Sequence, residues 1–285
     1  MAGLTEPVVQ PYQSAAALRP AFLRVAHLDK TFTRRVNREE QHLKVLDDVS
    51  LDAARGEFVT VIGPSGCGKS TLLNCVAGLT DYDGGTIDLD GVAIAGPGAD
   101  RAVVFQQASL LPWRTVQRNV AYGLELRREL SSHEIAERVA AVLELVGLKG
   151  FEAHFPHEIS GGMQQRTNLA RALAVDPKLV LMDEPFGALD ALTKETLQDE
   201  LSALAGHIER TTVFITHDID EAVYLGDKVI VMTPRPGRIL AQIDVPFARP
   251  RARSVTETER FNQLVHELRA LLQGPARVGH DEERS

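Results

Sequence analysis

The sequence has little cysteine and no apolar run long enough to cross a membrane. Its two cysteines, Cys67 and Cys75, are eight residues apart, and a helix would separate their backbones by roughly 12 Å, which no disulfide spans. Neither cysteine has the spacing of a zinc site. We therefore expect both thiols to be free. No uncharged stretch approaches the roughly 20 residues of a membrane helix and no signal peptide opens the chain, so we expect a soluble, cytosolic protein.

Positive charge is also in deficit. The chain of 285 residues carries 31 Lys and Arg against 39 Asp and Glu, a net charge of -8. A surface of this sign repels a polyphosphate backbone, so a general nucleic-acid binder is not expected. The content of 44% hydrophobic and 25% charged residues is that of a globular protein and excludes disorder throughout.

Periodicity divides the chain into β-rich and helical parts. Residues 1–20 hold three prolines without a sustained period, which predicts a mobile leader. From Phe22 onward, near alternation predicts short, partly antiparallel strands. The continuously β-favouring stretch 58–62 (FVTVI) is typical of a strand buried on both faces of a parallel sheet.

A mainly helical stretch is predicted between about residues 115 and 175, where Ser131 and Glu134 form a capping box for a helix that stops at Gly147. Buried-strand composition returns at three places, and strands alternating with helices predict a parallel α/β sheet. These places are 178–182, 212–215 and 228–232. Beyond a basic stretch that begins at Arg249, helical spacing predicts one more helix, through Phe261, Leu264, Leu268, Leu271 and Leu272.

A glycine-rich segment, which we call the phosphate loop, follows the strand at 58–62 and opens a helix. It matches G-x-x-x-x-G-K-[ST] and consists of Gly63, Pro64, Ser65, Gly66, Cys67, Gly68, Lys69, Ser70 and Thr71. Glycines let backbone N–H groups and the positive helix end point at one phosphate chain. Lys69 would meet the β- and γ-phosphates, and Ser70 would offer Mg²⁺ a hard oxygen. The alternative is a glycine turn with a surface lysine.

Two further segments carry chemistry that fits a nucleotide. Asp183 and Glu184 follow a buried strand, where Asp183 suits Mg²⁺ or its water and Glu184 suits polarising the attacking water. The segment Ser160-Gly161-Gly162 precedes a helix, so it predicts a second anion site that could close the open side of a γ-phosphate. Without the other motifs, it would be an ordinary capped helix.

These motifs occur in an order that resembles the ATPase subunit of an ATP-binding cassette (ABC) transporter over about residues 22 to 240. Besides the segments above, the matching residues are Gln106, Gln164-Gln165-Arg166, Pro185, Ala188-Leu189-Asp190 and His217. The resemblance implies an α/β fold: a P-loop NTPase core with a parallel sheet, an N-terminal antiparallel β subdomain and a helical subdomain inserted at about 107–166. The ATPase domain would cover 21–240, with a leader at 1–20 and a tail at 241–285.

The resemblance also implies residue roles in a head-to-tail homodimer that binds ATP and Mg²⁺. Ser160, Gly161 and Gly162 of one copy would cover ATP held by the phosphate loop of the other. Gln106 would sense Mg²⁺ and the attacking water, His217 would bond the γ-phosphate, and Asp190 would lie at the dimer seam. Phe32 would stack on adenine, unless it is an ordinary core phenylalanine.

Some residues differ from the family's usual pattern, and other segments indicate one branch of the family. Ile159 and Met163 replace the usual Leu and Gln, and the polar segment 33–45 is longer than common. The segment around Trp113 predicts either a docking surface or an anchor within the helical subdomain. Together with the stretches 185–193, 217–224 and 234–238, this segment resembles the branch of the family that serves nitrate, taurine and aliphatic sulfonate importers, which implies a small anion as solute.

The resulting hypothesis is an importer ATPase on the cytoplasmic side of the inner membrane. Its partners would be permease subunits and, through them, a periplasmic or lipid-anchored solute-binding protein. The alternatives are a soluble cassette protein in DNA repair or translation, and a phosphate-loop kinase or GTPase. Neither a kinase nor a GTPase explains Ser160-Gly161-Gly162 or His217.

Overall fold

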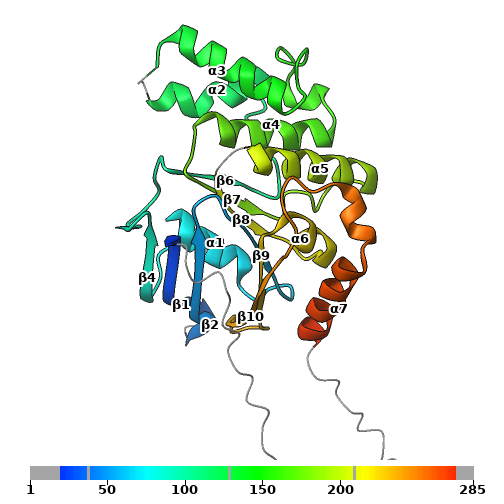
Figure 1. Ribbon diagram of the computed structural model, residues 1–285. Coiled ribbons are helices and arrows are strands. Elements are labelled where there is room, and N and C mark those ends of the chain that lie inside the picture. The colour runs from blue at the N-terminus through cyan, green and yellow to red at the C-terminus, as the bar shows by residue number, and fades with distance from the viewer. Residues whose placement is uncertain (1–19, 37–38, 128–129, 208–209, 274–285) are drawn as a thin grey trace, which may run out of the picture.

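The computed structural model describes residues 20–36, 39–127, 130–207 and 210–273 of the chain. The leader expected at residues 1–20 lies outside the described residues except for its last position. Two sheets, with helix α1 between them and further helices over the far side of the larger sheet, make up the described part (Figure 1).

The larger sheet has the strand order β10-β9-β3-β8-β7-β6. All neighbours in it are parallel except the edge strand β10, which runs antiparallel to β9. The bounds are β3 Phe58–Ile62, β6 Arg101–Val104, β7 Leu179–Asp183, β8 Thr211–Ile215, β9 Lys228–Met232 and β10 Ile239–Asp244. The predicted parallel α/β sheet is confirmed, and the antiparallel edge strand was not foreseen.

Strand β3 takes part in two separate hydrophobic cores. Val59 and Val61 belong to the core shared with helix α1 (Lys69–Ala77), whereas Phe58 and Ile62 belong to the core under the other helices. All five residues of the strand are buried. A strand with helices on both faces needs large apolar side chains in both directions, which accounts for the absence of a polar face in FVTVI.

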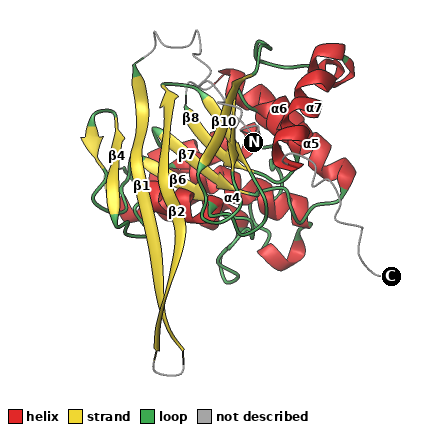
Figure 2. Cartoon of the chain, turned by 90° about the horizontal axis from the view of Figure 1, so that it is seen from below, coloured by secondary structure: helices red, strands yellow, loops and turns green. Residues whose placement is uncertain are grey.

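The smaller sheet is antiparallel in the order β2-β1-β4-β5. Its bounds are β1 Ala21–Val36, β2 Glu39–Ala54, β4 Gly84–Leu89 and β5 Val92–Ala93. The expectation of short strands was wrong for β1 and β2, which have 16 residues each and form a long projecting hairpin (Figure 2).

The described parts of the polar segment, 33–36 and 39–45, belong to these two strands, with Phe32 opposite Leu43 and Thr33 opposite His42. An antiparallel ladder is held by backbone hydrogen bonds, so it continues through polar side chains that face solvent.

The helices between β6 and β8 are α2 Val116–Arg127, α3 Ser132–Leu145, α4 Gly161–Ala174 and α5 Ala191–His207. The capping box is confirmed: Ser131 N–H donates to Glu134 Oε2 at 2.7 Å, and Glu134 N–H donates to Ser131 Oγ at 3.3 Å. The helix ends before Gly147, which has a φ of 67°. None of the helices in the described ranges is both long and apolar enough to cross a bilayer.

The C-terminal segment packs into the body of the protein. Strand β10 extends the larger sheet, so the domain boundary expected at residue 240 falls inside a strand. The predicted last helix is α7 (Glu259–Gln273), and its residues Phe261, Leu264 and Leu268 lie in the same core as Phe58 of β3. The helix contacts β9 and helix α6 (Ile219–Leu225).

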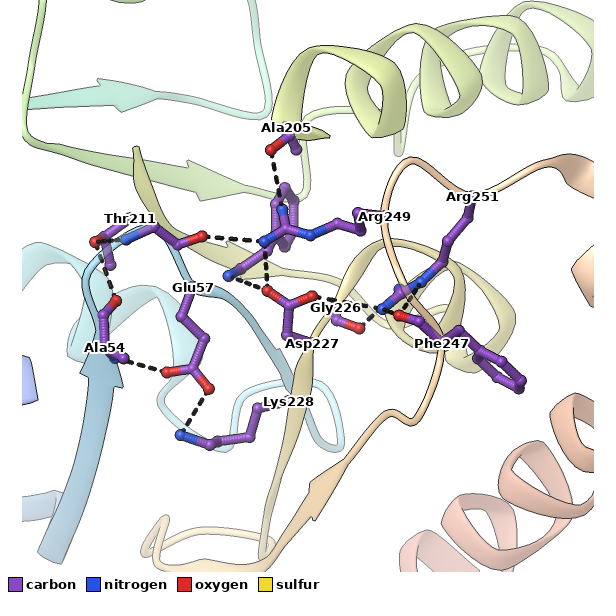
Figure 3. A network of polar contacts seen from close by, with 12 residues as sticks. Ala54, Glu57, Ala205, Thr211, Gly226, Asp227, Lys228, Phe247, Arg249 and Arg251 are labelled. Carbon is purple, nitrogen blue, oxygen red and sulfur yellow. Dashed lines mark hydrogen bonds and ion pairs between the residues drawn. The ribbon is translucent and has the colours of Figure 1, made fainter. Parts of the chain in front are cut away.

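A buried arginine joins the C-terminal segment to α6. The guanidinium of Arg251 donates to the carbonyls of Val223, Tyr224 and Gly226 at 3.1, 2.8 and 2.8 Å, and also to Phe247 at 2.8 Å. The carbonyls at the end of a helix have no partner within the helix, and a cation there is favoured by the dipole. Figure 3 shows Arg251 and Arg249 converging on Asp227. Burial lowers the pKa of Arg251 to about 10, so the group stays charged at neutral pH.

Replacing Arg251 with leucine is expected to lower the free energy of unfolding by about 3 kcal/mol, because buried carbonyls at the end of α6 lose their donors. Urea titration followed by circular dichroism measures this change. Arg260→Ala, at an exposed position of α7, is the control and should stay within about 0.5 kcal/mol of the parent. A loss below about 1 kcal/mol in Arg251→Leu would mean that water replaces the guanidinium.

Candidate nucleotide site

The phosphate loop connects β3 to α1 and holds its lysine firmly. Lys69 is the first residue of α1 and is 6% exposed. Its Nζ donates to the carbonyls of Gly63 and Pro64 at 2.8 and 3.2 Å. These bonds hold a positive charge inside a loop that leads into the N-terminus of a helix. Backbone N–H groups of such a loop, together with the positive helix end, bind phosphate.

Glycine is required at two positions of the loop. Gly66 has a φ of 72° and Gly68 a φ of 114°, values that side chains with a Cβ rarely adopt. A Cβ on Gly68 would also lie 2.8 Å from Cδ2 of Leu46. The loop can therefore curl closely against β2 only because these positions lack side chains.

Ser70 and Asp183 meet at the carboxyl edge of the larger sheet. The Ser70 hydroxyl donates to Asp183 Oδ1 at 3.1 Å, which joins the start of α1 to the end of β7. Burial raises the pKa of Asp183, and the nearby charge of Glu184 adds to the rise. Two hard oxygens at this place fit Mg²⁺, which takes its other ligands from phosphate and water. Among the described residues, no group of three or more His, Cys, Asp or Glu side chains is arranged to hold a metal ion by itself.

Glu184 and His217 form a hydrogen-bonded pair at the ends of β7 and β8. His217 Nδ1 lies 3.0 Å from Glu184 Oε2. The backbone N–H of Glu184 donates to the Ile215 carbonyl at 3.0 Å, and Glu184 has a φ of 44°. A left-handed backbone is uncommon for a residue other than glycine and is concentrated at functional sites. The turn thus fixes the direction of the carboxylate.

Gln106 comes close to this pair from the end of β6. A Cβ built on Gly187 would lie 3.3 Å from Gln106 Nε2 and 3.8 Å from Glu184 Oε2. Both polar groups therefore lie beside Gly187. The structure brings together Gln106, Glu184 and His217 at the ends of neighbouring parallel strands, as their places after those strands suggested.

The Ser160-Gly161-Gly162 segment lies in another part of the molecule. Ser160 caps α4 as expected, since its hydroxyl accepts from Met163 N–H at 3.3 Å. Figure 1 shows α4 beneath α2 and α3, whereas α1 lies between the two sheets. One chain thus does not bring this segment to its own phosphate loop.

Asp190 lies near the same glycines. Its Oδ1 accepts from Thr193 N–H at 3.1 Å, and hydrogen bonds from Thr193 lower the pKa of Asp190. A Cβ on Gly162 would lie 2.6 Å from Cγ2 of Thr193, so the starts of α4 and α5 are in contact. The structure therefore groups the Ser-Gly-Gly segment with Asp190 on one exposed region.

The remaining expectations concern an aromatic residue and the cysteines. Phe32 is 42% exposed, with Lys30 Nζ 5.1 Å from its ring centroid, so the core alternative is wrong and the ring is open to a partner. Both cysteines are free and buried, which confirms the expected thiols. Burial raises the pKa of Cys75 to about 11.

The sequence interpretation missed an arginine that contacts the phosphate loop. Arg235 follows β9 and donates two hydrogen bonds to the carbonyl of Gly66. The available signal was the Pro-Arg-Pro-Gly pattern of a tight turn directly after a strand. Because β9 lies parallel to and beside β3, a turn at its carboxyl end reaches the same edge of the sheet.

Comparison with known proteins agrees with this geometry. A family model described as "ABC transporter" matches residues 46–187. The taurine import ATP-binding protein TauB of Rhizobium johnstonii is 47% identical over 88% of this chain and 96% of its own length. The nitrate import ATP-binding protein NrtD of Synechococcus elongatus is 43% identical over 95% of this chain and 97% of its own length.

Among solved structures, the chain resembles a dimeric post-hydrolysis state of the ATP-binding cassette MJ0796 bound to ADP and Pi. The TM-score is 0.69 at 31% identity, covering 79% of this chain and 100% of that one. The phosphate loop, the acidic strand end and the extent of these matches lead to one conclusion. The chain belongs to the ABC transporter family, as one of its ATP-hydrolysing subunits.

Proposed function

We propose that two copies of this chain bind two ATP molecules between them and drive an importer of a small anion. The observation that carries the dimer is the separation of the Ser160-Gly161-Gly162 segment from the phosphate loop of the same chain (Figure 1). A helix end that closes a γ-phosphate can reach it only from a second copy, and a two-fold arrangement then gives two equal sites. The dimeric cassette MJ0796 shows that a relative assembles in pairs.

The chain's own side chains divide the work of hydrolysis. Glu184 accepts the proton of the attacking water, His217 orients Glu184 and contacts the γ-phosphate, and Gln106 holds the water between them. Ser70 and Asp183 would hold Mg²⁺, which when bound neutralises charge on the phosphates. Lys69 and the N–H groups of the phosphate loop bind the β- and γ-phosphates. Phe32 stacks on the adenine from the exposed face of β1.

Hydrolysis opens the dimer because only the triphosphate joins the two copies. Once the γ-phosphate leaves, the helix end at Ser160 loses its partner, and Asp190 at the seam separates with it. A membrane permease that binds the helical subdomains would follow this movement. In this proposal the subunit lies on the cytoplasmic face of the inner membrane, and a periplasmic or lipid-anchored solute-binding protein delivers the solute to the permease from outside.

An anionic solute is supported by the relatives named for taurine and nitrate import. The test is transport into vesicles that carry this subunit, the permease whose gene neighbours its own, and the matching solute-binding protein. ATP-dependent uptake of nitrate, taurine or an alkanesulfonate is expected. If the complex forms and hydrolyses ATP but moves none of these, the anion assignment is wrong while the ATPase stands.

The surface for the permease includes Trp113. This side chain is 71% exposed and therefore does not anchor the helical subdomain from within. The next residue, Arg114, has its guanidinium carbon 4.9 Å from the centroid of the Tyr122 ring. A large exposed aromatic side chain is typical of a residue that becomes buried on binding.

Replacing Trp113 with alanine is expected to weaken co-purification with the permease at least about tenfold, since central aromatic residues dominate interfaces. Hydrolysis by the isolated subunit should be unchanged. Leu240→Ala, which removes an exposed apolar side chain from β10, is the control. Full association of Trp113→Ala with the permease would remove this residue from the docking surface.

A further inference from the structure

The turn between β9 and β10 lies against the phosphate loop through a single arginine. Arg235 Nε and Nη2 donate to the carbonyl oxygen of Gly66 at 3.0 and 2.8 Å. The two residues are 169 positions apart in the chain. Arg235 itself is exposed, so this contact contributes to the conformation of the loop more than to the core.

A glycine of the same turn comes even closer to the loop. A Cβ on Gly237 would collide with the carbonyl oxygen of Cys67 and would lie 2.8 Å from Met232 Cε. Gly237 N–H donates to the Val45 carbonyl at 2.8 Å, and its own carbonyl accepts from Asp47 N–H at 3.0 Å. The turn is therefore held to β2 by backbone hydrogen bonds and is in close contact with the phosphate loop.

Side chains close this assembly from outside. Arg238 Nε donates to Asp47 Oδ2 at 2.6 Å, and Lys44 pairs with the same carboxylate. Hydrogen bonds from Lys44 and Arg238 lower the pKa of Asp47. Within the turn, Thr233 N–H donates to the Arg238 carbonyl at 2.9 Å. Arg235 is thus presented to Gly66 from a turn that is anchored at both ends.

The loop that receives Arg235 needs such support. Gly66 has a φ of 72° and no side chain, and within the loop the peptide that follows it is held by a long hydrogen bond, 3.3 Å, from Cys67 N–H to the Pro64 carbonyl. A phosphate-binding loop works only when its N–H groups point the same way, and ordering a flexible loop on binding weakens affinity. A guanidinium fork on the Gly66 carbonyl fixes the plane of the peptide that carries the Cys67 N–H.

We propose that Arg235 is a positioning residue of the ATP site, which pre-organises the phosphate loop by holding the peptide between Gly66 and Cys67. This inference rests on the assignment of the phosphate loop as the ATP site. It predicts an effect on nucleotide affinity and little effect on the chemical step, because Glu184 and His217 lie after the ends of other strands, β7 and β8.

The test compares Arg235→Ala, Arg235→Lys and Arg238→Ala in the full chain, with ATP hydrolysis and binding of a non-hydrolysable ATP analogue as readouts. Arg235→Ala is expected to raise KM and the analogue Kd about tenfold, with kcat changed less than about twofold. Arg235→Lys should recover only part of the affinity, because an ammonium cannot form the planar fork. Arg238→Ala should have the smaller effect, since the backbone bonds of Gly237 still hold the turn.

Each other outcome has a defined meaning. Full rescue by lysine, with affinity that falls steeply with salt, would show a direct charge effect on the phosphates and overturn the positioning role. A fall in kcat together with a fall in melting temperature in Arg235→Ala would indicate a structural role and would also overturn the positioning role. Parent-like affinity of Arg235→Ala, with binding lost in Lys69→Ala, would sink this inference alone. Parent-like affinity in both variants would sink the ATP-site assignment as well.

Discussion

Replacing Glu184 with glutamine is expected to slow ATP turnover by at least about a hundredfold while ATP binding persists. In the parent, His217 Nδ1 lies 3.0 Å from Glu184 Oε2. The amide keeps the shape of the side chain and this hydrogen bond, but it cannot accept the proton of the attacking water. Because the γ-phosphate stays intact, the variant should also accumulate as an ATP-bound dimer. Phosphate release measures the first effect and size-exclusion chromatography with ATP the second.

The control for this variant is Glu137→Gln, which changes an exposed glutamate on α3 that lies 3.4 Å from His133 Nε2. It should hydrolyse ATP like the parent and remain monomeric under the same conditions. Parent-like turnover in Glu184→Gln would show that another group activates the water. A slow variant that stays monomeric with ATP would instead leave the base in place and refute the shared site of two copies.

Replacing Lys69 with alanine is expected to lower ATP affinity about a hundredfold, because charge-assisted hydrogen bonds to phosphate are lost. The fold should persist, since among the described residues the Lys69 ammonium donates only to the carbonyls of Gly63 and Pro64 within its own loop. Titration with a fluorescent ATP analogue measures affinity, and far-UV circular dichroism reports the fold.

Lys149→Ala is the matched control, since Lys149 is an exposed lysine paired with Glu144. Its affinity for ATP should equal that of the parent. Unchanged affinity in Lys69→Ala would count against the phosphate loop as the nucleotide site. An unfolded variant would show that the two carbonyls need the ammonium for folding, and Lys69→Met would then separate burial from charge.

Local pattern was sufficient for much of the site. A buried strand followed by Asp183 and Glu184 places carboxylates at the edge of a parallel sheet wherever that sheet forms, and the structure has them there. Ser131 and Glu134 are three residues apart, so their capping box depends on sequence alone. In these cases the deciding interactions are close in the chain.

Interactions distant in the chain could not be read in the same way. The φ of 44° at Glu184 depends on a contact with the neighbouring strand: the backbone N–H of Glu184 donates to the carbonyl of Ile215 at the end of β8. The length of β1 and β2 depends on their mutual pairing, because the polar residues of 33–45 carry no strand pattern of their own. Arg235 finds Gly66 only after β9 has docked beside β3.

The alternating burial of β3 has a consequence for how this protein can change over evolution. Inserting one residue before Phe58 would exchange the two faces of the strand, so that Phe58 and Ile62 would enter the space filled by Val59 and Val61. The same slip would displace Gly63 from its place at the start of the phosphate loop. Length changes are thus forbidden directly before the nucleotide site, while the outer part of the β1–β2 hairpin, exposed at 33–34 and 40–44, is free to lengthen or shorten among descendants of the chain.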